Sequence, residues 1–182
     1  MNSLAMVVRF LCLINRVFGF VLSWLTLGIV LVCFTVVVLR YVFSMGFVWM
    51  QDLYVWMNGV MFMGIAGYTL LKEGHVRVDI FYRTASPKHR AKVDIFGCLV
   101  FIAPFVYVMF SYLYPYVRRS WRFMENSPNF GGMEGFFIVK TFILVFATVI
   151  AIQALAMIGR SILTLADRSD LVPEDYRYKE HV

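Results

Sequence analysis

Four long apolar runs, separated by charged or turn-forming segments, dominate the pattern along the chain. They cover residues 17–39, 53–71, 95–117 and 141–159. At about 1.5 Å per residue these runs reach roughly 28–34 Å, which is enough to cross the hydrocarbon core of a bilayer. The pattern therefore predicts an all-α integral membrane protein with four transmembrane helices, in which residues 17–160 form the transmembrane domain.

The segments that flank this domain differ from it in polarity. Residues 1–16 are apolar but include Arg9, Asn15 and Arg16, which predicts an N-terminal helix lying at the membrane interface. A cleaved signal peptide is the alternative. It is disfavoured because the uncharged run after Arg16 is too long and no small-x-small cleavage site follows it. Residues 161–182 are polar and are expected to form a short, mobile cytoplasmic tail.

Composition agrees with the membrane class. Of 182 residues, 61% are hydrophobic and 15% are charged, whereas soluble domains are about half apolar and a quarter charged. The net charge of +6 comes from cations near the ends of the runs. Membrane lipid is therefore the expected anionic partner, and nucleic acid is not expected. Cys12, Cys33 and Cys98 lie in apolar stretches without a CxxC pair, so no disulfide or zinc framework is expected.

The segment between the second and third runs, residues 72–92, carries six of the seventeen Lys and Arg residues. Such basic loops stay on the cytoplasmic side, because Lys and Arg near the ends of spans resist translocation. The N- and C-termini then also lie in the cytoplasm, together with twelve of the seventeen cations. The five cations left outside are Arg40, Arg118, Arg119, Arg122 and Lys140.

The apolar runs contain no Asp, Glu, Lys, Arg or His. Ionisable groups within a membrane mark proton relays and ion paths, so this chain is not expected to transport by itself. His75, His89 and His181 all lie in polar segments, which disfavours haem ligation within the helices. We find no motif for a catalytic, cofactor or metal site, and predict none.

Small residues recur in three of the runs, which favours close helix packing. These sets are Gly19, Ser23 and Thr26; Gly59, Gly64 and Gly67; and Ala147, Ala151 and Ala154. Gln153 is expected to form a hydrogen bond between helices, and Pro104 is expected to kink the third helix.

Two sets of charges on the outer side leave alternatives open. Asp52 suits the positive end of a helix dipole, and the alternative is a contact to a partner subunit or an ion. Arg118, Arg119 and Arg122 suit either a periplasmic partner or lipid headgroups.

Several short motifs occur in order along the chain. They are Arg40-Tyr41-Val42-Phe43, then Trp49 with Asp52, then Gly74-His75-Val76-Arg77-Val78-Asp79, and finally Glu125-Asn126-Ser127, which is similar to a Glu-x-Ser motif. From about residue 15 to 160, the sequence resembles the DctQ-like small membrane subunit (Q subunit) of tripartite ATP-independent periplasmic (TRAP) transporters. It departs from that family in having Gln51-Asp52 in place of an acid pair and no proline between Gly131 and Thr141.

The resemblance implies a small subunit of the bacterial inner membrane with two protein partners. The large membrane (M) subunit would be an elevator-type carrier with the substrate and sodium sites, and this chain would pack on its scaffold. The periplasmic substrate-binding protein would dock nearby, with Arg118, Arg119, Arg122 and Glu125 as the expected contacts. Uptake would be sodium-driven, for organic acids such as C4-dicarboxylates or sialic acid.

Residues 74–79 are expected to form a structural cytoplasmic corner, in which Gly74 turns the chain and Arg77 and Asp79 pair with helix ends or each other. The alternative is a solvated loop that serves topology only. For the whole chain, the alternatives are a membrane anchor of an unrelated complex, such as a respiratory enzyme, and a stand-alone small carrier.

Overall fold

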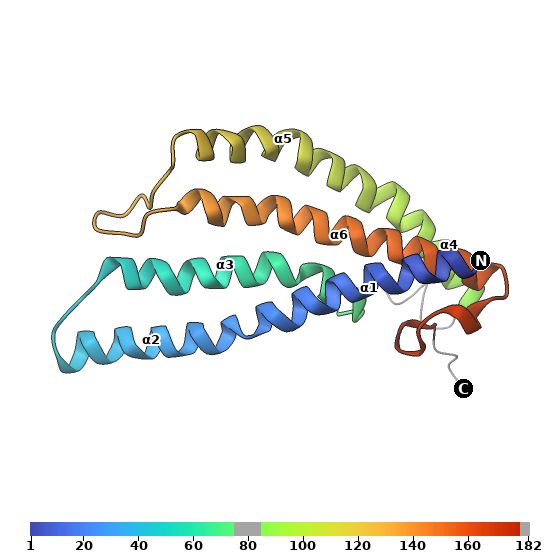
Figure 1. Ribbon diagram of the computed structural model, residues 1–182, viewed down its shortest axis with the longest axis horizontal. Coiled ribbons are helices and arrows are strands. Elements are labelled where there is room, and N and C mark those ends of the chain that lie inside the picture. Colours follow the sequence, from blue (N-terminus) through green and yellow to red (C-terminus); the bar gives the residue numbers. More distant parts are fainter. Residues whose placement is uncertain (75–84, 179–182) are drawn as a thin grey trace.

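The computed structural model describes residues 1–74 and 85–178, which form helices and connecting loops without a strand. The helices are α1 (Asn2–Ser23), α2 (Leu25–Val42), α3 (Val48–Leu71), α4 (Pro87–Gly97), the π turn η2 (Cys98–Ile102), α5 (Ala103–Arg122) and α6 (Phe136–Leu165), followed by the 3-10 turns η3 (Ser169–Leu171) and η4 (Glu174–Tyr176). They form an elongated bundle (Figure 1). We call the end with both termini and α4 the termini end, and the opposite end the loop end.

The all-helical membrane fold expected from the sequence is confirmed. Within the described residues, four helical rods are long and apolar enough to cross a membrane. Each rod extends beyond the apolar run that predicted it. The sequence runs were ended at charged residues, whereas Asp52, Lys140 and Arg160 lie inside helices and are buried there.

The first rod contains no helix end near residue 16, where an interfacial helix was expected to give way to the first span. Helices α1 and α2 run on from Asn2 to Val42 with one irregular turn at Trp24. At about 1.5 Å per residue this rod is roughly 60 Å long, about twice the thickness of a hydrocarbon core. The interfacial position of residues 1–16 therefore stays a prediction, because no break in the helix separates them from the first span.

Helices α1, α3 and α6 meet at Gly67. A Cβ atom at this position would lie 2.4 Å from Asn15 Oδ1 on α1 and 2.7 Å from the Val149 carbonyl oxygen on α6. Ala147 and Ala154 are buried on α6, so the predicted packing role of small residues is confirmed there. Gly59 is different, because its nearest neighbours would be 3.8 Å from an added Cβ.

The third rod is curved (Figure 1), and its irregularity coincides with the predicted kink. The π turn Cys98–Ile102 directly precedes α5, whose second residue is Pro104. Proline lacks the N–H of a regular helix, and a π turn is one of the known ways in which a helix adjusts to such a site. Pro115 lies farther along α5, inside the helix.

The chain beyond α6 corrects the expectation of a mobile tail. Val172 and Tyr176 are buried, at 1% and 3% exposure. They join a core cluster with Val8 and Cys12 of α1 and Leu163 of α6. We call residues 166–178 the C-terminal strap, because this segment crosses from α6 onto α1.

Candidate functional site

Asp52 fastens the loop between α5 and α6 to the start of α3. The residue is buried, and its Oδ1 accepts a hydrogen bond from Asn129 Nδ2 at 2.8 Å. Its Oδ2 accepts from the Met133 backbone N–H at 3.0 Å. Gly132 lies against the carboxylate, and an added Cβ there would be 2.3 Å from Oδ2. Asp52 therefore does more than complement a helix dipole, since it positions the loop within its own chain.

Glu125 is engaged in a second polar contact at the loop end. Lys140 Nζ donates to both of its carboxylate oxygens, at 2.7 and 2.6 Å, and Ser120 Oγ donates at 2.7 Å. These hydrogen bonds, from Lys140 first, hold the pKa of Glu125 below its ordinary value. The Lys140 ammonium also lies 4.3 Å from the centre of the Tyr116 ring. Glu125 was expected to contact a periplasmic partner, but here it orders the link between α5 and α6.

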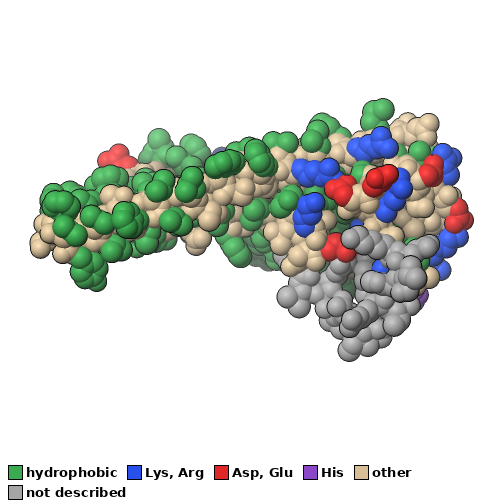
Figure 2. Space-filling view, turned by 90° about the horizontal axis from the view of Figure 1, so that it is seen from below, with side chains coloured by type: hydrophobic (Ala, Val, Ile, Leu, Met, Phe, Trp, Pro, Cys, Tyr) green, Lys and Arg blue, Asp and Glu red, His purple; other side chains and the backbone are tan. Residues whose placement is uncertain are grey.

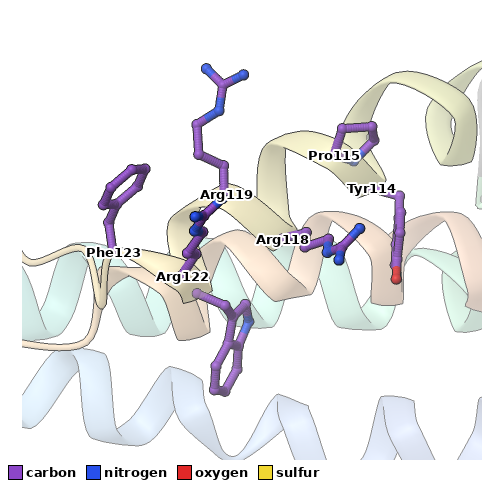
Figure 3. Close-up of a pocket in the computed structure, with 7 residues that line it drawn as sticks. Tyr114, Pro115, Arg118, Arg119, Arg122 and Phe123 are labelled. Atoms are coloured by element: carbon purple, nitrogen blue, oxygen red, sulfur yellow. The ribbon is translucent and has the colours of Figure 1, made fainter.

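Three arginines on the last turns of α5 take no part in these contacts with Asp52 and Glu125. Arg118, Arg119 and Arg122 are exposed, and within the described residues none of them pairs with an acid. Together with four neighbours they line an open hollow of about 860 Å³ (Figure 3). We call this set the loop-end basic surface, comprising Tyr114, Pro115, Arg118, Arg119, Trp121, Arg122 and Phe123.

The loop-end basic surface rests on an ordered support. Trp121 donates from Nε1 to Thr141 Oγ1 at 2.8 Å, and its ring lies 4.5 Å from that of Phe137 on α6. In Figure 3, Arg119 extends away from the other helices. A rigid aromatic base with outward guanidinium groups can bind carboxylates or phosphates, because guanidinium donates pairs of parallel hydrogen bonds.

The remaining sequence motifs do not converge on one site. Arg40, Tyr41 and Phe43 are exposed at the end of α2, and Trp49 is half exposed at the start of α3. The rings of Phe47 and Trp49 lie 6.4 Å apart. These positions suit interface anchors, which is the part that aromatic and basic residues play at the ends of spans.

The expected corner at residues 74–79 is described only at its first residue. The chain turns there through Glu73, which has φ of 58°, while Gly74 has no positive φ. The left-handed residue at this turn is thus Glu73, and the structural corner at residues 74–79 stays a prediction. Gly74 instead lies in close contact with Thr69, whose Cγ2 would be 3.1 Å from an added Cβ. His75, Arg77 and Asp79 lie outside the described residues.

The termini end contains a buried ion pair that the sequence did not reveal. Arg160 of α6 is 1% exposed and donates from Nη2 to Asp94 Oδ2 of α4 at 2.7 Å. Its Nη1 lies 3.2 Å from Glu73 Oε1. The guanidinium also stacks between the rings of Tyr176 and Tyr178, with centroids at 4.3 and 4.1 Å. One arginine thus joins α4, α6, the end of α3 and the C-terminal strap.

Hydrogen bonds extend this ion pair across the bundle. Gln153 accepts from Asn15 Nδ2 at 2.9 Å and donates to the Tyr176 hydroxyl at 2.7 Å, which confirms its predicted interhelical bond. The Tyr178 hydroxyl donates to Asp94 at 2.6 Å. Burial raises the pKa of both tyrosine hydroxyls, so they stay protonated, and Tyr178 remains a donor to Asp94.

The chemistry of these two ends is that of assembly. Acids and bases satisfy one another inside the chain, and they order a loop at one end and a strap at the other. The sequence pattern did not identify Asp94, Lys140, Arg160, Tyr176 or Tyr178 as members of hydrogen-bonded or ionic pairs. It placed each of them at the edge of an apolar run or in the C-terminal tail. A signal existed for one pair, since Asp94 and Arg160 border adjacent membrane runs on the same predicted side.

Comparison with known families identified a match over most of the chain. A family model described as "Tripartite ATP-independent periplasmic transporters, DctQ component" matches residues 29–164. Searches of curated proteins and of solved structures gave no match.

Proposed function

Because this chain belongs to the DctQ component family of tripartite ATP-independent periplasmic transporters, we propose that it packs on the scaffold of a large elevator-type subunit and helps to receive the periplasmic binding protein. The observation that carries this proposal is the confinement of charged side chains to the two ends of the bundle. The middle of each described rod is free of them. A subunit that assembles and orients partners needs such ends, whereas the path of a charged substrate needs polar groups in mid-membrane.

The contact with the large subunit would use the apolar outer faces. Helix α2 has no buried residue. On α5, Tyr107 and Tyr112 are more than 70% exposed. Lipid or a second membrane protein would cover these faces, and exposed aromatic rings offer a large contact area at low entropic cost.

The binding protein would dock at the loop-end basic surface. Its three exposed arginines have no acid partner among the described residues, so an acidic patch on another protein would complement them. This orientation places the loop end in the periplasm and both termini in the cytoplasm of a bacterium with an inner membrane. The excess of Lys and Arg at the termini end supports that orientation.

Substrate binding and coupling to sodium would belong to the large subunit. The four described rods carry no charge in their middle parts that could hold a carboxylate or a cation. We propose uptake of an organic acid of the C4-dicarboxylate or sialic acid type, as its resemblance to small subunits of this kind implies.

The experiment is co-purification followed by reconstitution. The tagged chain is extracted from its native membrane in mild detergent, and its partners are identified by mass spectrometry. We expect a large multi-span subunit at equal stoichiometry, and sodium-dependent uptake in liposomes only when the large subunit, this chain and the binding protein are all present. Co-purified redox subunits would instead identify an anchor of a respiratory enzyme, and uptake at the full rate without this chain would contradict the proposal.

A further inference from the structure

A second basic hollow lies at the termini end, between α1 and the C-terminal strap. It encloses about 470 Å³ and is lined on α1 by Arg9, Leu13 and Arg16, and on the strap by residues that include Val172, Glu174 and Arg177. We call it the strap pocket. The mid-membrane part of the bundle plays no part in it.

Two of its arginines are fixed in place without being neutralised. Arg9 Nη2 donates to the Leu171 carbonyl at 3.3 Å. Arg177 donates from Nε to the Val172 carbonyl at 2.8 Å and from Nη2 to the Asp170 carbonyl at 2.6 Å. Neither forms an ion pair within the described part of the chain. Both keep a full charge and unused N–H donors, and this combination binds an oxyanion well.

The third arginine is only partly compensated. Arg16 donates to Asp175, which also lies 3.9 Å from Lys72 Nζ. The buried Nε of Arg16 has no partner in the described residues. Glu174 opposes the arginines, and its exposed side chain forms no ion pair among the described residues. The basic groups outnumber the acidic ones, so the pocket is positive.

An apolar stripe leads away from the strap pocket along α1. Leu13, Val17, Phe20 and Trp24 follow helical spacing and are each at least half exposed. Leu13 belongs to both the stripe and the pocket. Figure 2 shows the same transition on a larger scale, with hydrophobic surface along the bundle and charged side chains gathered at one end. A ligand that fits both parts has an anionic head and a long apolar body.

We propose that the strap pocket binds the phosphate headgroup of an anionic phospholipid, whose acyl chains lie along the exposed apolar stripe of α1. Basic pockets beside membrane helices recognise anionic lipids in this way, through local charge at the bilayer surface. A bound lipid would also tie α1 to the strap, because its phosphate would lie between Arg9 and Arg177. The proposal requires the termini end to lie at a membrane surface and does not depend on transport.

The test measures lipid binding to the full chain in detergent by native mass spectrometry. Phosphatidylglycerol is titrated against phosphatidylcholine of the same acyl chains, with inorganic phosphate as a competitor. We expect preferential retention of phosphatidylglycerol that millimolar phosphate does not abolish. Equal retention of the two lipids would overturn the proposal, and displacement by phosphate alone would identify a site for a soluble anion instead.

Variants of the pocket residues show where the lipid binds and whether a loss of binding comes from unfolding of the strap. Arg9→Gln combined with Arg177→Gln should weaken phosphatidylglycerol binding about thirtyfold, given roughly 1 kcal/mol per cation at an anionic surface. The matched control, Arg40→Gln with Lys92→Gln, removes the same charge from exposed positions outside the strap pocket and should leave that affinity unchanged.

Glu174→Gln removes the opposing charge and should strengthen phosphatidylglycerol binding about threefold to fivefold. Its exposed side chain forms no ion pair among the described residues, so the fold is unaffected. If the arginine variant loses binding and Glu174→Gln gives no gain, the loss reflects disruption of the strap and the proposal is wrong.

Discussion

Charged residues buried near helix ends connect separate parts of this chain. Asp52 holds the α5–α6 loop, Lys140 holds Glu125, and Arg160 holds Asp94 and the strap. A buried charge is tolerated only where a partner compensates for lost hydration. Each of these residues therefore fixes a local geometry, and removing one partner should be more harmful than removing an exposed charge.

Asp52→Asn should loosen the loop around residues 127–133. The amide keeps one acceptor oxygen but replaces the second with a donor that faces the Met133 N–H, so we expect a cost of about 1–3 kcal/mol. Hydrogen–deuterium exchange of the loop in detergent measures the change. Glu134→Gln is the matched control, since this exposed side chain forms no ion pair in the described structure and its loss should not alter exchange. Identical exchange in both variants would mean that Asp52 does not anchor the loop.

Arg160→Met should destabilise the termini end by about 3–5 kcal/mol, because it removes the guanidinium that pairs with the buried Asp94 carboxylate. Thermal unfolding followed by size-exclusion chromatography measures the loss. Adding Asp94→Asn should restore part of the stability, because the buried charge is then gone. Arg168→Met, at a half-exposed position, is the control and should cost at most about 1 kcal/mol. A double variant as unstable as the sum of the two single variants would argue against coupling.

At the scale of elements, close approach decides which helices pair. The centre of the bundle is the contact of α3 and α6, with α1 against both. Helix α2 contacts α3 without burying any residue of its own. In a membrane, helix association depends on close packing more than on expulsion of water, so small residues at crossings have a large effect.

Gly67→Ala should therefore separate α1, α3 and α6 at their common contact. The added methyl would lie 2.7 Å from the Val149 backbone oxygen, which cannot move as freely as a side chain, and we expect a loss of about 1–3 kcal/mol. Gly97→Ala is the matched control, because nothing lies within 4 Å of its added Cβ. That substitution should be neutral or stabilising by about 0.5–1 kcal/mol, as usual for glycine in a helix. Equal melting temperatures for the two variants would contradict the contact.

At the scale of the whole molecule, an apolar surface along the bundle leads to a charged termini end (Figure 2). The loop end offers exposed arginines over an aromatic base. At the termini end, charged side chains pair with one another inside the chain, and the strap pocket lies beside them. This division suits a subunit that joins a membrane partner along its sides and a soluble partner at one end.

Replacing Arg118, Arg119 and Arg122 together by Gln should weaken docking of the binding protein without disturbing the membrane complex. Rim charges act mainly on association, so we expect the association rate to fall about tenfold at low salt and the difference to shrink at high salt. Surface plasmon resonance on the reconstituted complex measures the rate. Arg9→Gln with Lys88→Gln at the opposite end is the control and should leave the rate unchanged. An unaltered rate in the triple variant would place the docking site elsewhere.

Sequence reasoning succeeded where a single helix decides the outcome. The apolar runs predicted four membrane helices, and Pro104 marked the irregularity of the third rod. Prediction from the sequence failed for ion pairs whose two residues lie far apart along the chain. Glu125 and Lys140 are 15 residues apart, while Asp94 and Arg160 are 66 apart, and no local pattern joins them.

The sequence by itself determined the membrane class, the helical fold and the family, because hydropathy and helix length act locally and the family's motifs are short segments. Only the tertiary structure decided that the polar end of the chain folds back as a strap, that Glu73 takes the left-handed conformation after α3, and that Asp52 and Glu125 order the loop end. The physical reason is that a charged residue near the end of a span gives the same sequence pattern whether water, lipid or a buried partner compensates its charge. Packing of the helices brings the partners together and selects among these outcomes.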